Sequence, residues 1–140
     1  HMQFFVVGSK VTEEIKALEQ PGNGIVIKGF VSDEELEAIY QQCRIVVVPL
    51  RYGAGVKGKV VEAIYNGAPI VTTSVGAEGI PEVEKTLEIA DGAEEFARKT
   101  VELYQNPKRL KELSDSTQEY IRANFSVDGA WDVVKEDFTR

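Results

Sequence analysis

The sequence contains five short runs of apolar, mostly β-branched residues, and amphipathic segments separate them. The runs cover positions 4–7, 25–27, 45–48, 70–73 and 87–90. Runs of this length without polar alternation are typical of parallel strands that have both faces covered by helices. We therefore predict an α/β fold, a Rossmann-like, doubly wound parallel sheet of about five strands with flanking helices. In such a sheet, ligands bind beyond the carboxyl ends of the strands.

Helix signals occupy the segments between the runs and continue after the last one. Ser32, followed three residues later by Glu35, forms a capping box that begins one helix. A second helix is predicted from about Lys57 to Asn66, with Gly67 as its C-terminal stop. After Gly92 the pattern is helical to the end, so the C-terminal third is predicted to be helical. The segments are marked by Phe96 to Tyr104, by Pro107 to Ile121, and by Trp131, Val134 and Phe138 after Ser126.

Composition limits the classes of protein to which this chain can belong. With 140 residues, 43% of them hydrophobic and 28% charged, we expect one globular domain over residues 3–140. The first two residues resemble a cloning remnant, and removing them removes His1, the single histidine. We therefore expect no histidine-based catalytic triad and no metal site. A lone cysteine, Cys43, and the lack of a long apolar run favour a soluble, cytoplasmic protein without membrane insertion.

The net charge of −7 argues against binding to nucleic acid or to an anionic membrane, yet one stretch has the opposite sign. Residues 38–61 contain no acidic residue and carry four cations, namely Arg44, Arg51, Lys57 and Lys59. One interpretation is that this stretch contains a strand, which needs no charged residue, and that a few lysines happen to follow it. The other is a local anion site in an otherwise acidic protein.

The loop at 49–59 favours the anion site. Three glycines (Gly53, Gly55 and Gly58) allow the backbone to approach a ligand closely. The free N–H groups of the following helix attract an anion, and Lys57 and Lys59 add full charges. We prefer this phosphate cradle to a flexible turn with solvated lysines. Residues 53–59 also satisfy the P-loop pattern formally, but the required Ser or Thr is replaced by Val60, so we regard that match as accidental.

Glu62 lies in the first two turns of the predicted helix, and core-type residues flank it. A carboxylate near a phosphate-binding helix can accept hydrogen bonds from ribose hydroxyls. The alternative is a solvent-facing glutamate that is favoured by the helix dipole. Spacing alone does not separate these two readings.

Taken together, the ordered motifs resemble the nucleotide-sugar-binding half of the group 1 glycosyltransferases (family 4, GT-B fold). The motifs that carry the resemblance are Gly29-Phe30-Val31, residues 45–50, residues 53–63, residues 67–73, Phe125-Ser126 and the Trp131 segment.

The resemblance implies a site for a nucleoside-diphosphate sugar, with UDP or GDP as the nucleotide. By analogy with the family, Glu62 would hold the ribose, and the amides of Gly55, Val56 and Lys57 would hold the diphosphate. The base would lie beside Gly29, Phe30 and Val31. Such enzymes typically retain the anomeric configuration and need neither metal nor cofactor, and here Lys57 and Lys59 would stabilise the leaving nucleotide. A role in polysaccharide biosynthesis is also expected.

Two departures from the family pattern affect these expectations. The family commonly has a first glutamate eight positions before the ribose-binding one, where this chain has Ala54. The resemblance also implies an N-terminal acceptor domain and a first strand ahead of Phe4. We therefore expect a fragment that is inactive alone and that pairs with its N-terminal domain. To complete the sheet, the run at 4–7 would pair with the run at 45–48, or two copies would form a homodimer.

Two other functions are compatible with the same sequence features. A GT-B sugar-nucleotide epimerase would share the same nucleotide site. A non-catalytic α/β binding module would explain the alanine at position 54.

Overall fold

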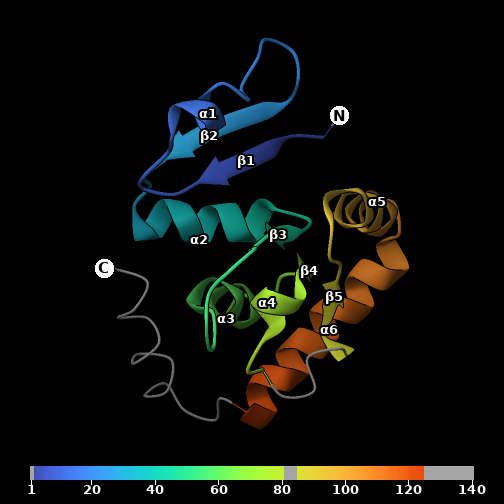
Figure 1. Ribbon diagram of the computed structural model, residues 1–140. Helices are drawn as coiled ribbons and strands as arrows, with labels where there is room; N and C mark the ends of the chain where they lie inside the picture. Colours follow the sequence, from blue (N-terminus) through green and yellow to red (C-terminus); the bar gives the residue numbers. More distant parts are fainter. Residues whose placement is uncertain (1, 81–84, 125–140) are drawn as a thin grey trace. The chain divides into compact units, whose positions relative to one another are not determined.

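The computed structural model describes residues 2–80 and 85–124, which divide into two compact units between Ile39 and Tyr40 (Figure 1). The helix predicted after Ser126, with Trp131, lies outside the described residues.

The first unit contains a two-stranded parallel sheet. Strand β1 (Phe4–Val7) pairs with β2 (Ile25–Gly29), and the short helix α1 (Glu13–Lys16) lies between them in the chain. Helix α2 (Asp33–Gln42) follows. Its predicted cap is confirmed, because the Glu35 amide donates to the Ser32 hydroxyl at 3.2 Å and that hydroxyl donates to the Glu35 carboxylate at 3.4 Å.

The second unit contains a three-stranded parallel sheet in the order β3-β4-β5. Its strands are β3 (Val46–Val48), β4 (Ile70–Thr72) and β5 (Leu87–Ile89), and its helices are α3 (Gly58–Tyr65), α4 (Ser74–Ala77), α5 (Ala93–Tyr104) and α6 (Pro107–Asn124). All pairings in both sheets are parallel, so the predicted α/β class with five parallel strands is confirmed. The strands form two sheets where one was expected.

Strand β4 lies at the centre of the second unit and is covered on both faces. Ile70 belongs to a cluster with the α3 residues Val60, Val61, Ala63 and Ile64. Its neighbour Val71 points to the opposite face and packs with Leu103 and Leu113 from α5 and α6. This two-sided burial explains why the sequence of β4 shows no polar alternation.

Helix α4 packs unusually closely on β4. The buried Thr72 hydroxyl donates to the Val48 carbonyl at 2.8 Å. A Cβ atom added to Gly76 would lie only 1.9 Å from the Thr72 hydroxyl oxygen. Glycine is therefore required at position 76 for this close packing.

Each sheet has one edge that is closed by side chains of its own unit. On β2, the outward amides of Ile25 and Ile27 donate to the Asn23 and Glu19 side chains at 3.1 and 2.9 Å. On β5, the Ile89 carbonyl accepts from the Lys99 ammonium group at 2.8 Å. These side chains compete with a further strand for the backbone groups that they occupy.

The other edge of each sheet is open. The amides of Phe4 and Gly8 donate to β2, so by strand alternation those of Phe5 and Val7 point to the opposite edge. Within residues 2–80 and 85–124, nothing caps that edge of β1, nor the corresponding edge of β3 at Val47.

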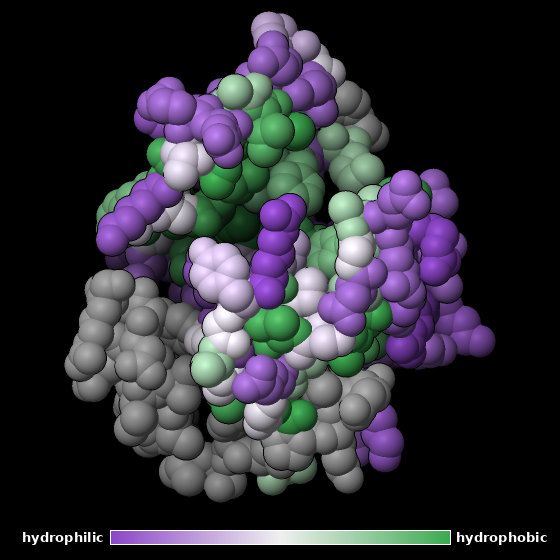
Figure 2. Space-filling view, in the orientation of Figure 1, coloured by the Kyte–Doolittle hydropathy of each residue, from purple (hydrophilic) through white to green (hydrophobic). Residues whose placement is uncertain are grey.

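The expectation that the run at 4–7 pairs directly with the run at 45–48 is wrong, because β1 pairs with β2 and β3 pairs with β4 in separate sheets. The two strands belong to different compact units, and each keeps the neighbour that its following connection supplies. Hydrophobic side chains consequently lie on the surface over β1 and β2 (Figure 2), where Phe4 and Phe5 are 43% and 39% exposed.

Candidate functional site

The loop from Pro49 to Lys57 leaves the carboxyl end of β3 and leads into α3. Its backbone is left-handed at Gly53 (φ 130°) and Gly55 (φ 75°), which explains both glycines. The Lys57 side chain folds back across Gly53, where a Cβ atom would lie 2.8 Å from Lys57 Cε, and its ammonium group donates to the Gly55 carbonyl. In this conformation the Lys57 side chain is therefore hydrogen-bonded to its own loop.

The N-terminus of α3 has no internal anion. Lys57 is the N-cap residue and makes no side-chain cap, and the first turn contains no acidic residue. The Lys57 carbonyl accepts from the amides of Val60 and Val61 at 3.1 and 3.2 Å. In the described part of the chain, the amides of Gly58 and Lys59 have no hydrogen-bond partner. Free amides and the helix dipole together attract an anionic ligand at this end.

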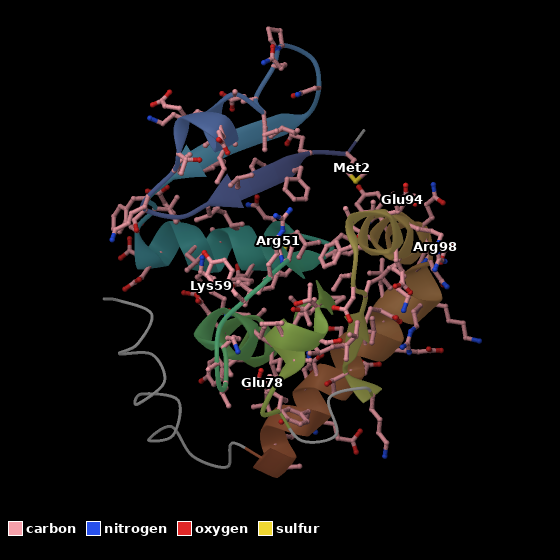
Figure 3. The ribbon with its side chains drawn as sticks, viewed as in Figure 1. Met2, Arg51, Lys59, Glu78, Glu94 and Arg98 are labelled. Carbon is pink, nitrogen blue, oxygen red and sulfur yellow. The ribbon has the colours of Figure 1, made fainter. Side chains whose placement is uncertain are left out.

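Two exposed cations accompany these amides. Arg51 comes from the loop and Lys59 from the first turn of α3 (Figure 3). Across residues 2–80 and 85–124, neither forms an ion pair, whereas Arg109 and Lys111 elsewhere in the unit do. Within the acid-free stretch found in the sequence, the loop from Pro49 to Lys57 and the first turn of α3 thus present these cations on the surface, and we call this loop the cationic loop.

Glu62 is the fifth residue of α3, which places it beyond the first turn, and its side chain is half-buried. The helix dipole acts mainly within the first turn, so it gives Glu62 little support. The carboxylate instead acts on Tyr40: burial of the Tyr40 hydroxyl and then the negative charge of Glu62 raise the pKa of Tyr40 far above its ordinary value.

Sequence reasoning missed a second carboxylate beside the loop. Glu78, at the end of α4, accepts a hydrogen bond from the Gly55 amide at 3.1 Å. The next residue, Gly79, approaches Val56 so closely that a Cβ atom would lie 2.8 Å from Val56 Cγ2. The one sequence signal was that Glu78 lies in the loop after β4, at the same sheet edge as the loop after β3.

Gly29, Phe30 and Val31 belong to the first unit and join β2 to α2. Gly29 has a left-handed backbone (φ 65°), and its carbonyl accepts from the Gly8 amide at 2.9 Å. The Phe30 ring is 79% exposed. Gly55, Val56, Lys57, Lys59 and Glu62, by contrast, all belong to the second unit, in the loop before α3 and in α3 itself.

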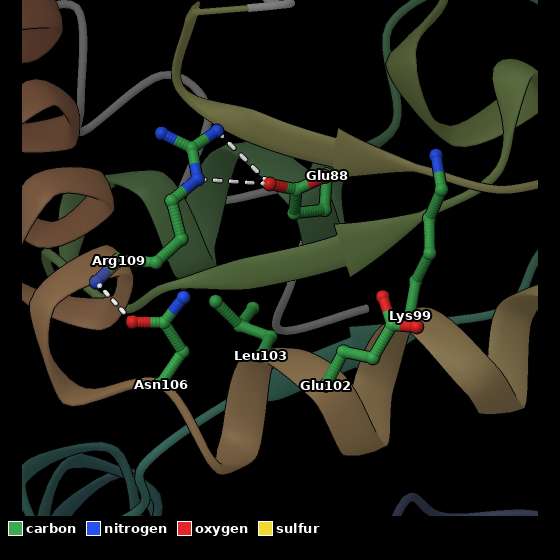
Figure 4. Close-up of a pocket in the computed structure, with 6 residues that line it drawn as sticks. All are labelled: Glu88, Lys99, Glu102, Leu103, Asn106 and Arg109. Carbon is green, nitrogen blue, oxygen red and sulfur yellow. Dashed lines mark hydrogen bonds and ion pairs between the residues drawn. The ribbon is translucent and has the colours of Figure 1, made fainter.

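A cavity of about 290 Å³ lies on the other side of the second unit, between β5, α5 and α6 (Figure 4). None of the predicted site residues lines it. Its charged walls are already paired, because Arg109 contacts the Glu88 carboxylate at 2.9 and 3.0 Å and Lys99 caps the Ile89 carbonyl. We therefore interpret these side chains as structural, because their polar contacts hold β5 to α5 and α6.

The described part of the chain lacks two features that would point to other functions. No helix there is both long and apolar enough to cross a membrane. No group of three or more His, Cys, Asp or Glu residues gathers there in an arrangement able to hold a metal ion.

Comparison with known proteins agrees with the resemblance seen in the motifs. Residues 1–106 match the family described as glycosyl transferases group 1. The chain is also 34% identical over 118 residues to an uncharacterized 44.6 kDa protein in the cps region of Klebsiella pneumoniae. The alignment covers 82% of this chain and 30% of that relative. The family match extends over the cationic loop, α3 and Glu78, and the chain therefore belongs to the group 1 glycosyltransferases.

Proposed function

We propose that this chain binds the nucleoside-diphosphate sugar donor of a retaining glycosyltransferase. The single observation that carries the proposal is the N-terminus of α3, where the amides of Gly58 and Lys59 are free and the exposed cations of Lys59 and, in the preceding loop, Arg51 have no ion-pair partner in the described part of the chain. A diphosphate matches this arrangement, because it carries multiple negative charges and acceptor oxygens.

Each predicted residue has a defined part in the proposal. The amides of Gly55, Val56 and Lys57, with those of Gly58 and Lys59, hold the diphosphate. Gly55 and Lys57 are the residues that must rearrange, because the Gly55 amide is bonded to Glu78 and the Lys57 ammonium group to the Gly55 carbonyl. Glu62 accepts hydrogen bonds from the ribose. Gly29, Phe30 and Val31 line the base, and the exposed Phe30 ring supplies a stacking surface.

Transfer breaks the bond between the anomeric carbon and the β-phosphate oxygen, and negative charge develops on the departing nucleoside diphosphate. In the proposal, Lys57, Lys59 and the α3 dipole stabilise that charge, which is the role that a divalent metal takes in other transferases. We propose that no metal or cofactor is needed for this step. The sugar goes to an acceptor that is bound outside this chain.

Two observations bear on the partners of the domain. They are the share of the relative that the chain covers and the uncapped edges of its sheets. The chain spans 30% of the Klebsiella relative, so we propose that an acceptor-binding domain completes the enzyme and that this chain alone is inactive. The uncapped edges of β1 and β3 are suited to a further strand of that protein or, in the isolated chain, to a second copy. The relative's location in a cps region supports the expected role in polysaccharide biosynthesis.

The direct test of the function is calorimetric titration with UDP, GDP and ADP, each compared with its nucleoside. We expect at least one diphosphate to bind at least tenfold more tightly than its nucleoside, because the nucleoside lacks the phosphates that the N-terminus of α3 would hold. Equal affinities across all three pairs would overturn the proposal.

A further inference from the structure

We infer that the carboxylate of Glu78 recognises hydroxyl groups of the donor sugar and thereby helps to determine which sugar the site accepts. The inference rests on the proposed function, because it requires a diphosphate on α3. It concerns a residue outside the predicted set of site residues.

Glu78 is held in place beside the loop from Pro49 to Lys57. Its Oε1 accepts from the Gly55 amide at 3.1 Å. Gly79 packs on Val56, and the Thr73 hydroxyl before α4 donates to the Leu50 carbonyl at 2.6 Å. These contacts join the loop after β4 to the loop after β3 at several points. The last two contacts do not involve the Gly55 amide, so they keep Glu78 beside the loop when that amide turns to the diphosphate.

The charge of Glu78 indicates which part of the ligand it faces. A carboxylate repels a phosphate group, so it fits poorly as a ligand for the diphosphate itself. The sugar is joined directly to that diphosphate and offers neutral hydroxyl donors. An ionised carboxylate is an acceptor with about four lone-pair sites, and the one that the Gly55 amide uses here becomes free when that amide turns to the diphosphate.

Few other side chains in or beside the loop from Pro49 to Lys57 can accept a hydrogen bond from a sugar hydroxyl. The side chains of residues 53–56 are hydrogen atoms, the Ala54 methyl group and the Val56 isopropyl group, and none of them accepts a hydrogen bond. Lys57 and Lys59 are donors only. Glu62, the other carboxylate near α3, lies beside Tyr40. In the described part of the chain, Glu78 is the acidic side chain that is hydrogen-bonded to the loop.

Calorimetry on matched ligand pairs tests this role. Wild type, Glu78→Gln and Glu78→Ala are titrated with UDP and UDP-glucose, GDP and GDP-mannose, and ADP and ADP-glucose. Because hydrogen bonds to charged groups are the strong ones, we expect both variants to bind the sugar nucleotide about tenfold more weakly. Affinity for the free diphosphate should stay within twofold. Glu94→Gln, an exposed glutamate in the first turn of α5, is the control and should change neither.

The other results each contradict the inference in a recognisable way. A variant that binds both ligands more tightly would show that Glu78 occupies the place of a phosphate. Equal weakening of both ligands, or a lowered melting temperature, would show that Glu78 only holds the loop. If wild-type protein binds no diphosphate, the proposed function itself fails, and the inference fails with it.

Discussion

The Glu62 carboxylate lies close enough to Tyr40 to raise the pKa of that phenol, second only to burial of the hydroxyl. Tyr40 comes from α2 and packs against the core that α3 covers. This relationship places the charge of Glu62 on the side of α3 that faces the Tyr40 hydroxyl. A glutamate that served only the helix dipole would need no such neighbour.

The first prediction separates ribose binding from a structural role of Glu62. Glu62→Gln keeps the size of the side chain but removes its charge, so it should weaken nucleoside diphosphate binding by about tenfold. The melting temperature should change little, because Glu62 lies beyond the first turn of α3. Calorimetry and thermal melting on the same protein measure both effects. Lowered stability with unchanged affinity would contradict the ribose assignment.

The second prediction concerns stability at alkaline pH. The pKa of Tyr40 is raised in the folded protein, so on raising the pH its phenol ionises first in the unfolded chain. Stability from Tyr40 is therefore fully present below about pH 10 and is lost as the pH rises further, by up to about 1.4 kcal/mol per pH unit. Urea unfolding between pH 9 and 11 should show this loss in wild type and a smaller one in Tyr40→Phe. Identical slopes for the two proteins would contradict it.

The third prediction tests the close packing of α4 on β4. Gly76→Ala places a methyl group on the Thr72 hydroxyl, and such overpacking typically costs 1–3 kcal/mol. Gly8→Ala is the matched control, because no atom lies within 4 Å of its added Cβ and its backbone is not left-handed. Chemical denaturation should show a loss for the first variant and a change below about 0.5 kcal/mol for the second. Similar losses would mean that α4 packs differently.

The fourth prediction addresses the open edge of β1. If a second copy pairs there, sedimentation velocity should show concentration-dependent dimerisation of the isolated chain. Val7→Pro removes an outward amide and should abolish the dimer without unfolding the sheet. Val6→Pro removes an amide directed toward β2 and should destabilise the first unit instead. A dimer that survives Val7→Pro uses another surface.

Local sequence signals were sufficient for much of the fold. The β-branched runs marked all five strands, and Ser32 with Glu35 marked the start of α2, because these patterns depend on neighbours within a few residues. The four-residue helices α1 and α4 were not predicted, since one turn is too short to show a hydrophobic period. The division into two sheets was also missed, because pairing between strands is not encoded within any one run.

The candidate site was predicted only in part for the same reason. The glycines and lysines of the cationic loop are contiguous, so their position before α3 followed from the sequence. The Gly55–Glu78 hydrogen bond joins residues 23 positions apart, and the relation of Glu62 to Tyr40 depends on how the Tyr40 side chain packs against the core of the second unit. The inward fold of Lys57 onto the Gly55 carbonyl depends on the left-handed glycines, and residue type alone did not indicate it.

The most direct measurement of the central claim is the affinity of the Lys57→Ala/Lys59→Ala double variant for UDP, GDP and ADP. The control is Lys108→Ala/Lys111→Ala, which removes the same charge from α6. Charge-assisted hydrogen bonds to phosphate predict a loss of about tenfold per lysine in the first protein and almost none in the second. Equal affinities of wild type and the Lys57/Lys59 double variant for all three diphosphates would contradict a diphosphate site at the N-terminus of α3.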